Sequence, residues 1–326
     1  MSAAAVRSVS ADAVLGRSAG RLDEGRVGRL WLPELTPVQS ALIEAVAYGD
    51  VFDHPLTMAE IHRQLPIRAS LRDVEFALAE PGLADFVHVV DGLVMLAGRE
   101  SLPAVRRRRA AASRRLWPQA IRLGRLVGTL PFVRMVAITG SLAVDAAESD
   151  ADVDLFLVTD TGRLWLSRAL TMGVVRAAAV GGLRLCPNYL VADSALELDD
   201  RSLYTAHELL QMVPVVGLSV HAELVRRNRW SAAFLPNSRG QAARGATSPG
   251  LPDRIVRQLL ERPLRSSLGD RLERWEMTRK IARLSALSRS IELRYDAACC
   301  KGHADEHGRR ILAAFDDRVA RLNGRR

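Results

Sequence analysis

Residues 136–143 have the sequence VAITGSLA, and residues 149–158 have the sequence SDADVDLFLV. Both contain apolar runs of strand-forming residues, which predict strands at 133–138 and 153–158. The first strand ends in Gly140-Ser141, where a turn into a helix would present backbone N–H groups and a hydroxyl to an anion. Glycine there permits close approach of a ligand to the backbone.

The second segment places two carboxylates on one face of a strand. Asp152 and Asp154 are separated by one residue, so their side chains point to the same side. Two such carboxylates repel each other unless a cation lies between them, and magnesium prefers hard oxygen ligands that it shares with substrate phosphates. The pair therefore predicts a site for Mg²⁺ or Mn²⁺. Simple turn chemistry around 149–152 is the alternative explanation.

Together the two segments resemble the DNA polymerase beta-type nucleotidyltransferase superfamily, whose signature is a hydrophobic strand, Gly-Ser, a spacer and Asp-x-Asp within a second strand. Here ten residues, 142–151, separate Ser141 from Asp152. The resemblance covers roughly 132–198 and implies a nucleotidyltransferase core that binds a nucleoside triphosphate (NTP) with its metal. It implies these roles: Gly140 and Ser141 as the phosphate-binding turn, and Asp152 and Asp154 as catalytic metal ligands.

The superfamily pattern also supplies one more acidic residue from a neighbouring strand. The matching strand is expected at 185–191, and the position that corresponds is Asn188. An amide oxygen can ligate magnesium, but it brings no charge and cannot act as a base toward an acceptor hydroxyl. Asp193 would replace it only if the strand shifts or bends, because it lies five residues on and faces the other side. We therefore expect slow or partner-dependent turnover.

The segment 35–97 predicts three helices followed by a hairpin. Helix-start signals occur at Thr36, Thr57 and Ser70, and Asp91-Gly92 separates two β-rich runs. This pattern is typical of a winged-helix domain. Joined to the core described above, it resembles a bacterial group of stand-alone nucleotidyltransferase-like proteins.

The third of these helices would be the one to enter a DNA groove. It carries Arg72, but also Asp73 and Glu75, with Glu80 directly after it. Because these carboxylates would repel phosphates, we expect the domain not to bind duplex DNA specifically. It should pack against a protein partner or the catalytic domain.

The overall prediction is an α+β protein with a winged-helix domain, a nucleotidyltransferase mixed-sheet core and C-terminal helices. The arginine run 106–109 is expected to be a solvated helix face, in preference to a phosphate-binding arm. The expected segments are a flexible tail at 1–34, the winged helix at 35–100, the core with its linker helix at 101–236, a flexible linker at 237–252 and a helical C-terminal region at 253–326.

Composition sets wider limits. The 326 residues suit two or three domains, and 48% hydrophobic with 25% charged residues exclude a wholly disordered chain. The net charge of +9 is nearly all arginine, since lysine occurs only at Lys280 and Lys301, so we interpret it as a coding bias rather than a nucleic-acid surface. Three cysteines form neither a disulfide framework nor a zinc motif, and no apolar stretch is long enough to span a bilayer. We expect a soluble, cytoplasmic protein without a membrane partner.

The function predicted from these features is transfer of a nucleoside monophosphate from a magnesium-bound NTP to an acceptor, with release of pyrophosphate. The sequence leaves three classes of acceptor open: a small molecule, a protein and a nucleic-acid end. The alternative is a non-catalytic, nucleotide-binding winged-helix regulator. Other polar residues are expected to be solvated or structural, although an acid of the spacer could assist a second metal and an arginine could reach phosphate: Asp145, Glu148, Asp150, Arg163, Arg168, His207, Glu208, His303 and His307.

Overall fold

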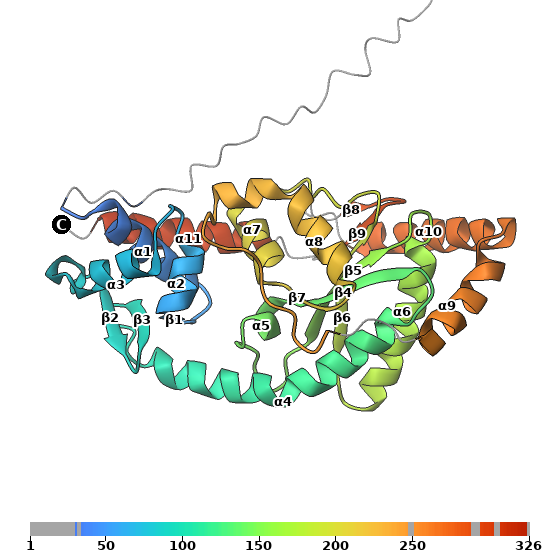
Figure 1. Ribbon diagram of the computed structural model, residues 1–326, viewed down its shortest axis with the longest axis horizontal. Helices are drawn as coiled ribbons and strands as arrows, with labels where there is room; N and C mark the ends of the chain where they lie inside the picture. Colours follow the sequence, from blue (N-terminus) through green and yellow to red (C-terminus); the bar gives the residue numbers. More distant parts are fainter. Residues whose placement is uncertain (1–29, 31–33, 247–250, 288–293, 303–306, 325–326) are drawn as a thin grey trace, which may run out of the picture.

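A computed structural model describes residues 30, 34–246, 251–287, 294–302 and 307–324. Helices and two β-sheets make it an α+β protein. A small unit containing β1 to β3 lies at one end of the molecule, and a larger sheet occupies its middle (Figure 1). Most of the tail expected at 1–34 lies outside the described residues; Leu30 is buried, and its N–H donates to Oε1 of Glu44 at 2.6 Å.

The small unit contains the three helices and the hairpin expected from the sequence. The residues at the three predicted helix starts, Thr36, Thr57 and Ser70, each cap a helix through a reciprocal capping box. At the hairpin, Asp91 and Gly92 adopt φ of 53° and 73°, as a two-residue turn requires. A short strand after the first helix completes an antiparallel sheet of order β1-β3-β2. The elements are α1 (Pro37–Asp50), β1 (Leu56–Thr57), α2 (Met58–Gln64), α3 (Leu71–Ala79), β2 (Val87–Val90) and β3 (Leu93–Leu96).

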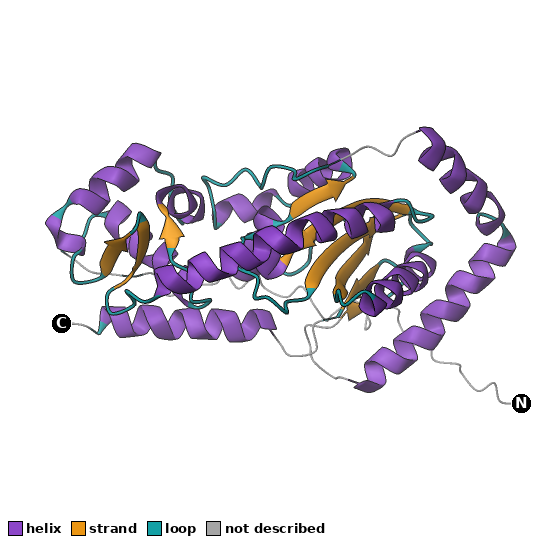
Figure 2. Cartoon of the chain, turned by 90° about the horizontal axis from the view of Figure 1, so that it is seen from below, coloured by secondary structure: helices purple, strands orange, loops and turns teal. Residues whose placement is uncertain are grey.

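The long helix α4 (Leu102–Gly128) runs from the small unit across the larger sheet (Figure 2). The expectation that its arginine run is solvated is wrong for two members. Arg106 donates to Oε1 of Glu60 at 2.8 Å, and Arg109 donates to Oε1 of Glu148 at 2.7 Å and to the carbonyl of Phe52 at 2.8 Å. These bonds fix the small unit against the helix and the loop beyond β4.

Within the described residues, the larger sheet has six strands in the order β7-β4-β5-β6-β9-β8; β5 and β6 run parallel to each other, and the other neighbouring pairs are antiparallel. Its two central antiparallel strands carry the motif segments. Helices α4 and α6 (Leu164–Val180) cover one face, whereas α7 (Leu203–Gln211) and α8 (Leu218–Arg227) pack on the other. The strands are β4 (Val133–Thr139), β5 (Val153–Thr159), β6 (Leu185–Ala192), β7 (Val213–Val216), β8 (Arg294–Tyr295) and β9 (Cys299–Lys301).

The sequence suggested a purely helical C-terminal region, and this expectation is wrong. It contains α9 (Leu251–Leu264), α10 (Ser267–Leu287) and α11 (His307–Asn323), but β8 and β9 between the last two extend the sheet. These strands are only two and three residues long, too short to show a period-two pattern. Of the linker expected at 237–252, residues 237–246 contain no helix or strand, 247–250 lie outside the described residues, and 251–252 already belong to α9.

The small unit packs against the sheet unit through a shared hydrophobic core. Leu42 of α1 belongs to the same buried cluster as Leu210 of α7 and Phe315 of α11. Tyr48 stacks on His207, with ring centroids 3.9 Å apart and planes 8° from parallel. The two units are therefore held in one fixed arrangement. None of the helices in the described segments is both long and apolar enough to cross a membrane.

Candidate active site

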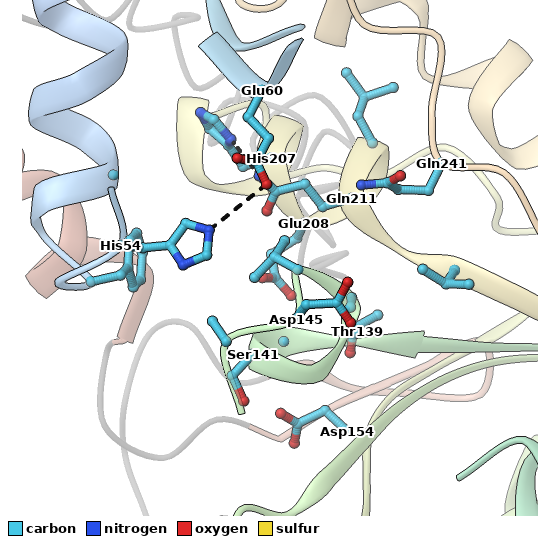
Figure 3. A pocket seen from close by; sticks show the side chains of 18 of the residues that line it. His54, Glu60, Thr139, Ser141, Asp145, Asp154, His207, Glu208, Gln211 and Gln241 are labelled. Atoms are coloured by element: carbon cyan, nitrogen blue, oxygen red, sulfur yellow. Dashed lines mark hydrogen bonds and ion pairs between the residues drawn. The ribbon is translucent and has the colours of Figure 1, made fainter. Parts of the chain in front are cut away.

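A cavity of about 790 Å³ lies between the small unit and the edge of the larger sheet (Figure 3). The sheet side of its wall includes every residue that the sequence analysis assigned to the site. The other side is formed by α1, α2 and the segment between them, by α7, and by the segment 238–244. The sequence-predicted residues that line the cavity are Gly140, Ser141, Asp152, Asp154 and Asn188.

The Gly140-Ser141 turn is shaped by its glycine. Strand β4 ends at Thr139 in extended conformation, Gly140 takes a φ of 65°, and the four-residue helix α5 (Gly140–Ala143) follows. A Cβ atom on Gly140 would lie 2.3 Å from Oδ2 of Asp154, closer than any two such atoms can approach. The turn therefore needs glycine for two independent reasons, its left-handed backbone and its contact with a carboxylate.

Strand register brings Asp154 and Asn188 to this turn. Asp154 pairs with Thr139 across β4 and β5. On the other side, the register between β5 and β6 shifts between Leu155 and Phe156, which leaves Asn188 as the extra residue of a bulge. Nδ2 of Asn188 donates to Oδ1 of Asp154 at 2.5 Å, and Oδ1 of Asn188 accepts from the thiol of Cys186. The side chain of Asn188 therefore lies directly beside Asp154.

The two motif carboxylates differ in environment. Burial, reinforced by the negative charge of Asp152, raises the pKa of Asp154 to about 6 even though the bond from Asn188 acts in the opposite direction. Asp152 is exposed and forms an ion pair with Nε of Arg184 at 2.7 Å. Burial and both carboxylates also raise the pKa of the Cys186 thiol to about 11, so this cysteine is a thiol and not a thiolate at neutral pH. The negative charges of Asp152 and Asp154 therefore lie close together at this part of the cavity.

The carboxylates of Asp152 and Asp154 are oxygen donors of the kind that magnesium prefers. Within the described segments, no three His, Cys, Asp or Glu side chains lie close enough together to hold a metal on their own. Asp152, Asp154 and Asn188 nevertheless line one cavity. Magnesium keeps several waters and commonly takes only one or two carboxylates together with phosphate oxygens.

Glu208 belongs to the site, although the sequence analysis treated it as a surface or structural residue. The Glu208 carboxyl lines the cavity and has no hydrogen-bond or ion-pair partner among the described residues. Burial, together with the charge of Asp154, raises its pKa to about 7. His207 also lines the cavity; its ring stacks on Tyr48, and burial lowers its pKa to about 3. A polar His-Glu pair within the apolar helix sequence LYTAHELLQ was the available signal.

Most other candidates make structural contacts. Asp145 was expected to be solvated or near a second metal, but it accepts from Trp117 at 2.7 Å and from two nitrogens of Arg244 at 2.9 Å. Burial alone would raise the pKa of Asp145, but these bonds hold it below its ordinary value. Glu148 pairs with Arg109, whereas Asp150 is exposed, as expected. Asp145 therefore tethers the segment at 244 over the cavity.

Two further alternatives lie away from the cavity. Asp193, considered as a replacement for Asn188, accepts from the N–H of Thr161 at 3.0 Å and from its hydroxyl at 2.5 Å. Arg163 pairs with Asp270 at 2.7 Å instead of facing a phosphate site.

Three candidates remain: Arg168, His307 and His303. Arg168 is partly buried, interacts with Cys300 and does not line the cavity. His307 does line it, and its ring meets that of Tyr204 edge-on with centroids 5.8 Å apart. His303 lies outside the described residues.

Comparison with known proteins gives no relative: no family model matches the chain, and neither a curated protein nor a solved structure is significantly similar to it.

Proposed function

We propose that the chain is a magnesium-dependent nucleotidyltransferase that transfers a nucleoside monophosphate from an NTP to an acceptor hydroxyl or phosphate and releases pyrophosphate. One observation carries the proposal: the glycine turn at Gly140 lies directly against Asp154 at the mouth of a cavity that Asp152 and Asn188 also line. This combination provides an anion-binding turn next to a cation-binding pair. A magnesium triphosphate requires both together.

Different residues of the chain would position the metal and the triphosphate. Asp152 and Asp154 would hold the metal, and the turn at Gly140 and Ser141 would orient phosphate oxygens through its backbone N–H groups and hydroxyl. Magnesium, when bound, neutralises the triphosphate and the charge that develops on the departing pyrophosphate. Arg184 pairs with Asp152, so it must give up part of that contact when the carboxylate binds a metal. Manganese would suit the same oxygen donors.

Glu208 supplies the acceptor side with a base that Asn188 cannot provide. Its pKa of about 7 lets it hold a proton transiently near neutral pH. When an acceptor hydroxyl attacks the α-phosphorus, its proton passes to the Glu208 carboxylate while the bond to pyrophosphate breaks. We therefore include Glu208 with Asp152 and Asp154 as a catalytic residue of the proposed reaction.

The second candidate function is a nucleotide-binding regulator without turnover. Two observations favour it: an amide lies beside Asp154, and the three helices and the β1-β3-β2 sheet of the small unit support the winged-helix interpretation. In either case the small unit acts as a wall of the cavity, because His54 and Glu60 line it. Fold alone does not choose between the two functions.

The decisive experiment is a screen of the four ribonucleoside triphosphates with Mg²⁺ or Mn²⁺. Thermal shift measures binding, pyrophosphate release measures turnover, and mass spectrometry identifies modified products. The enzyme hypothesis expects metal-dependent release that Asp154→Ala abolishes while folding is retained. Binding without release in the wild-type chain would favour the regulator, and no binding of any NTP would reject both.

A second pair of variants tests the base. Glu208→Gln should lower kcat about 100-fold while the affinity for the magnesium triphosphate changes little. In the wild type, kcat should rise with pH around a midpoint near pH 7, as Glu208 loses its proton. Glu208→Gln should remove this pH dependence. Glu223→Gln is the matched control, because that carboxylate pairs with Arg226 and Arg227 on the surface of α8. Unchanged turnover in Glu208→Gln would exclude it as the base.

A further inference from the structure

Helix α9 presents its polar side to the sheet unit and its apolar side to solvent. Glu261 is 4% exposed, and its Oε1 accepts from the N–H of Phe132 at 2.9 Å. Arg257 and Arg265, one turn before and one turn after Glu261, also form hydrogen bonds to the sheet unit. A surface helix normally buries its apolar stripe, so the arrangement of α9 is inverted. Four apolar residues on the sides of the helix that face away from Glu261 are 49–58% exposed: Ile255, Val256, Leu259 and Leu260.

Helix α10 repeats this inversion in its first half. Glu273 is 7% exposed, and its carboxylate accepts from the N–H groups of Trp165 and Leu166, both at 2.8 Å. Three apolar residues at spacings of four and three share a side of α10 that faces away from Glu273, and they are 38–61% exposed: Leu268, Leu272 and Trp275. Both helices lie at the end of the molecule away from the small unit (Figures 1 and 2). Single exposed apolar residues are ordinary, but stripes on two consecutive helices mark an interaction surface.

The exposed charges beside the two stripes are cationic. Arg262 of α9 and Arg271 and Arg274 of α10 are exposed and have no ion-pair partner among the residues that the structure describes. Of the four carboxylates described on these helices, three are buried, and Asp270 pairs with Arg163 at 2.7 Å. A second copy of the chain would bring further cations to this surface. The charge pattern therefore favours an anionic partner with an apolar interior.

We propose that α9 and the first half of α10 bind the surface of an anionic lipid bilayer. The apolar stripes would enter the boundary between headgroups and acyl chains, and the three unpaired arginines would contact lipid phosphates. Trp275 suits this boundary, because its ring is apolar and its indole N–H is polar. A partner helix from another protein would need a groove, whereas both stripes lie on outward-facing sides of their helices.

This surface contact is independent of nucleotidyl transfer, since it uses none of the residues of the proposed active site. The expectation of no membrane partner rested on the absence of a stretch that could span a bilayer, which a surface contact does not need.

Co-sedimentation of the full chain with lipid vesicles tests the proposal. The wild type should bind vesicles of phosphatidylcholine mixed with phosphatidylglycerol, and it should bind pure phosphatidylcholine at least about tenfold more weakly. Rising salt should weaken the binding to anionic vesicles. The double variants Leu259→Ser/Leu260→Ser and Arg271→Gln/Arg274→Gln should each weaken it about tenfold or more. All four side chains are exposed, so thermal unfolding should show that both variants remain folded.

Matched controls change the same residue types elsewhere. Phe76→Ser removes an apolar side chain that is 70% exposed on α3, and Arg114→Gln/Arg115→Gln removes two exposed charges from α4. Both controls should bind anionic vesicles as the wild type does. The proposal is overturned if the wild type does not bind anionic vesicles, if it binds neutral vesicles equally well, or if the controls lose as much binding as the test variants.

Two other outcomes would assign the surface to a different occupant and overturn the proposal. One is a wild type that ignores vesicles and forms a dimer in analytical ultracentrifugation, with Leu259→Ser/Leu260→Ser monomeric. The other is a wild type that ignores vesicles but binds an acidic amphipathic peptide through the same residues.

Discussion

The backbone of Gly140 packs directly against the carboxylate of Asp154: an added Cβ at Gly140 would lie 2.3 Å from Oδ2 and 3.2 Å from Cγ of Asp154. Strand pairing between β4 and β5 fixes this contact, because Thr139 is the register partner of Asp154. The phosphate-binding turn and the metal-binding carboxylate of the proposed site are therefore one structural unit. A substitution at either residue should therefore shift the position of the other.

Gly140→Ala should abolish magnesium-dependent nucleotide binding, because the methyl group must displace Asp154 or open the turn. Gly162→Ala is a matched control: Gly162 also has a positive φ, of 72°, but nothing lies within 4 Å of its added Cβ. Both variants should lose about 1 kcal/mol of stability from the left-handed backbone. Only Gly140→Ala should lose binding by calorimetry. Equal binding in the two variants would contradict the assigned contact.

Asp154 should make the stability of the metal-free chain depend on pH. Its pKa is raised from 3.8 to about 6 on folding, so its contribution to stability is fully present below about pH 3.8 and is lost as pH rises through about 6. Asp154→Asn removes the ionisation. In EDTA at pH 8 the variant should be more stable than the wild type by on the order of 1–2 kcal/mol, and near pH 4 the two should be alike.

Urea denaturation at the two pH values measures this difference. Asp150→Asn serves as the control, since Asp150 is an exposed carboxylate of the same segment. Magnesium with a triphosphate should restore stability to the wild type at pH 8 and not to Asp154→Asn. A wild type that is more stable than Asp154→Asn at pH 8 in EDTA would show that the carboxylate already has a compensating partner.

Much of the motif region could be predicted from the sequence because its signals are local. Apolar runs predicted β4 and β5, the capping boxes predicted the starts of α1, α2 and α3, and the one-residue spacing of Asp152 and Asp154 predicted that they lie on one side of the strand. Each signal depends on residues within a few positions of one another. Short-range patterns of this kind survive folding because they set backbone geometry directly.

Glu208 and His54 could not be predicted in the same way. Glu208 reaches the cavity only because α7 packs against the small unit, and His54 only because Arg106 draws the segment after α1 toward α4. Strands β8 and β9 likewise exist because β6 offers an edge, not because of any periodicity of their own. The arginine run was assigned to solvent for the same reason. Its partners, Glu60 and Glu148, are distant in sequence.

Asn188→Asp should increase turnover if the missing acid limits the proposed reaction. The new carboxylate would stand beside Asp154, where the amide now donates at 2.5 Å, and would give the metal a third charged ligand. Pyrophosphate release should rise about tenfold, and the magnesium concentration for half-maximal rate should fall. Because Asp193 is held by Thr161 away from the cavity, Asp193→Asn should leave the rate unchanged. A fast wild type that collapses on Asp193→Asn would show that the wrong residue was aligned.

Helix α3 should not recognise duplex DNA. Its exposed surface carries Glu75 and a Phe76 that is 70% exposed, with Arg72 as its cation. Carboxylates at a groove-facing helix oppose phosphate binding, and base readout needs donors or acceptors that phenylalanine lacks. With a net charge of +9, the full chain should still bind duplexes weakly and equally, with an affinity that falls steeply as salt rises. Fluorescence anisotropy with a pool of duplexes at physiological salt measures this. Tight binding to one sequence that Arg72→Ala removes would overturn the prediction, whereas binding that Glu75→Lys strengthens uniformly across sequences is the nonspecific behaviour expected.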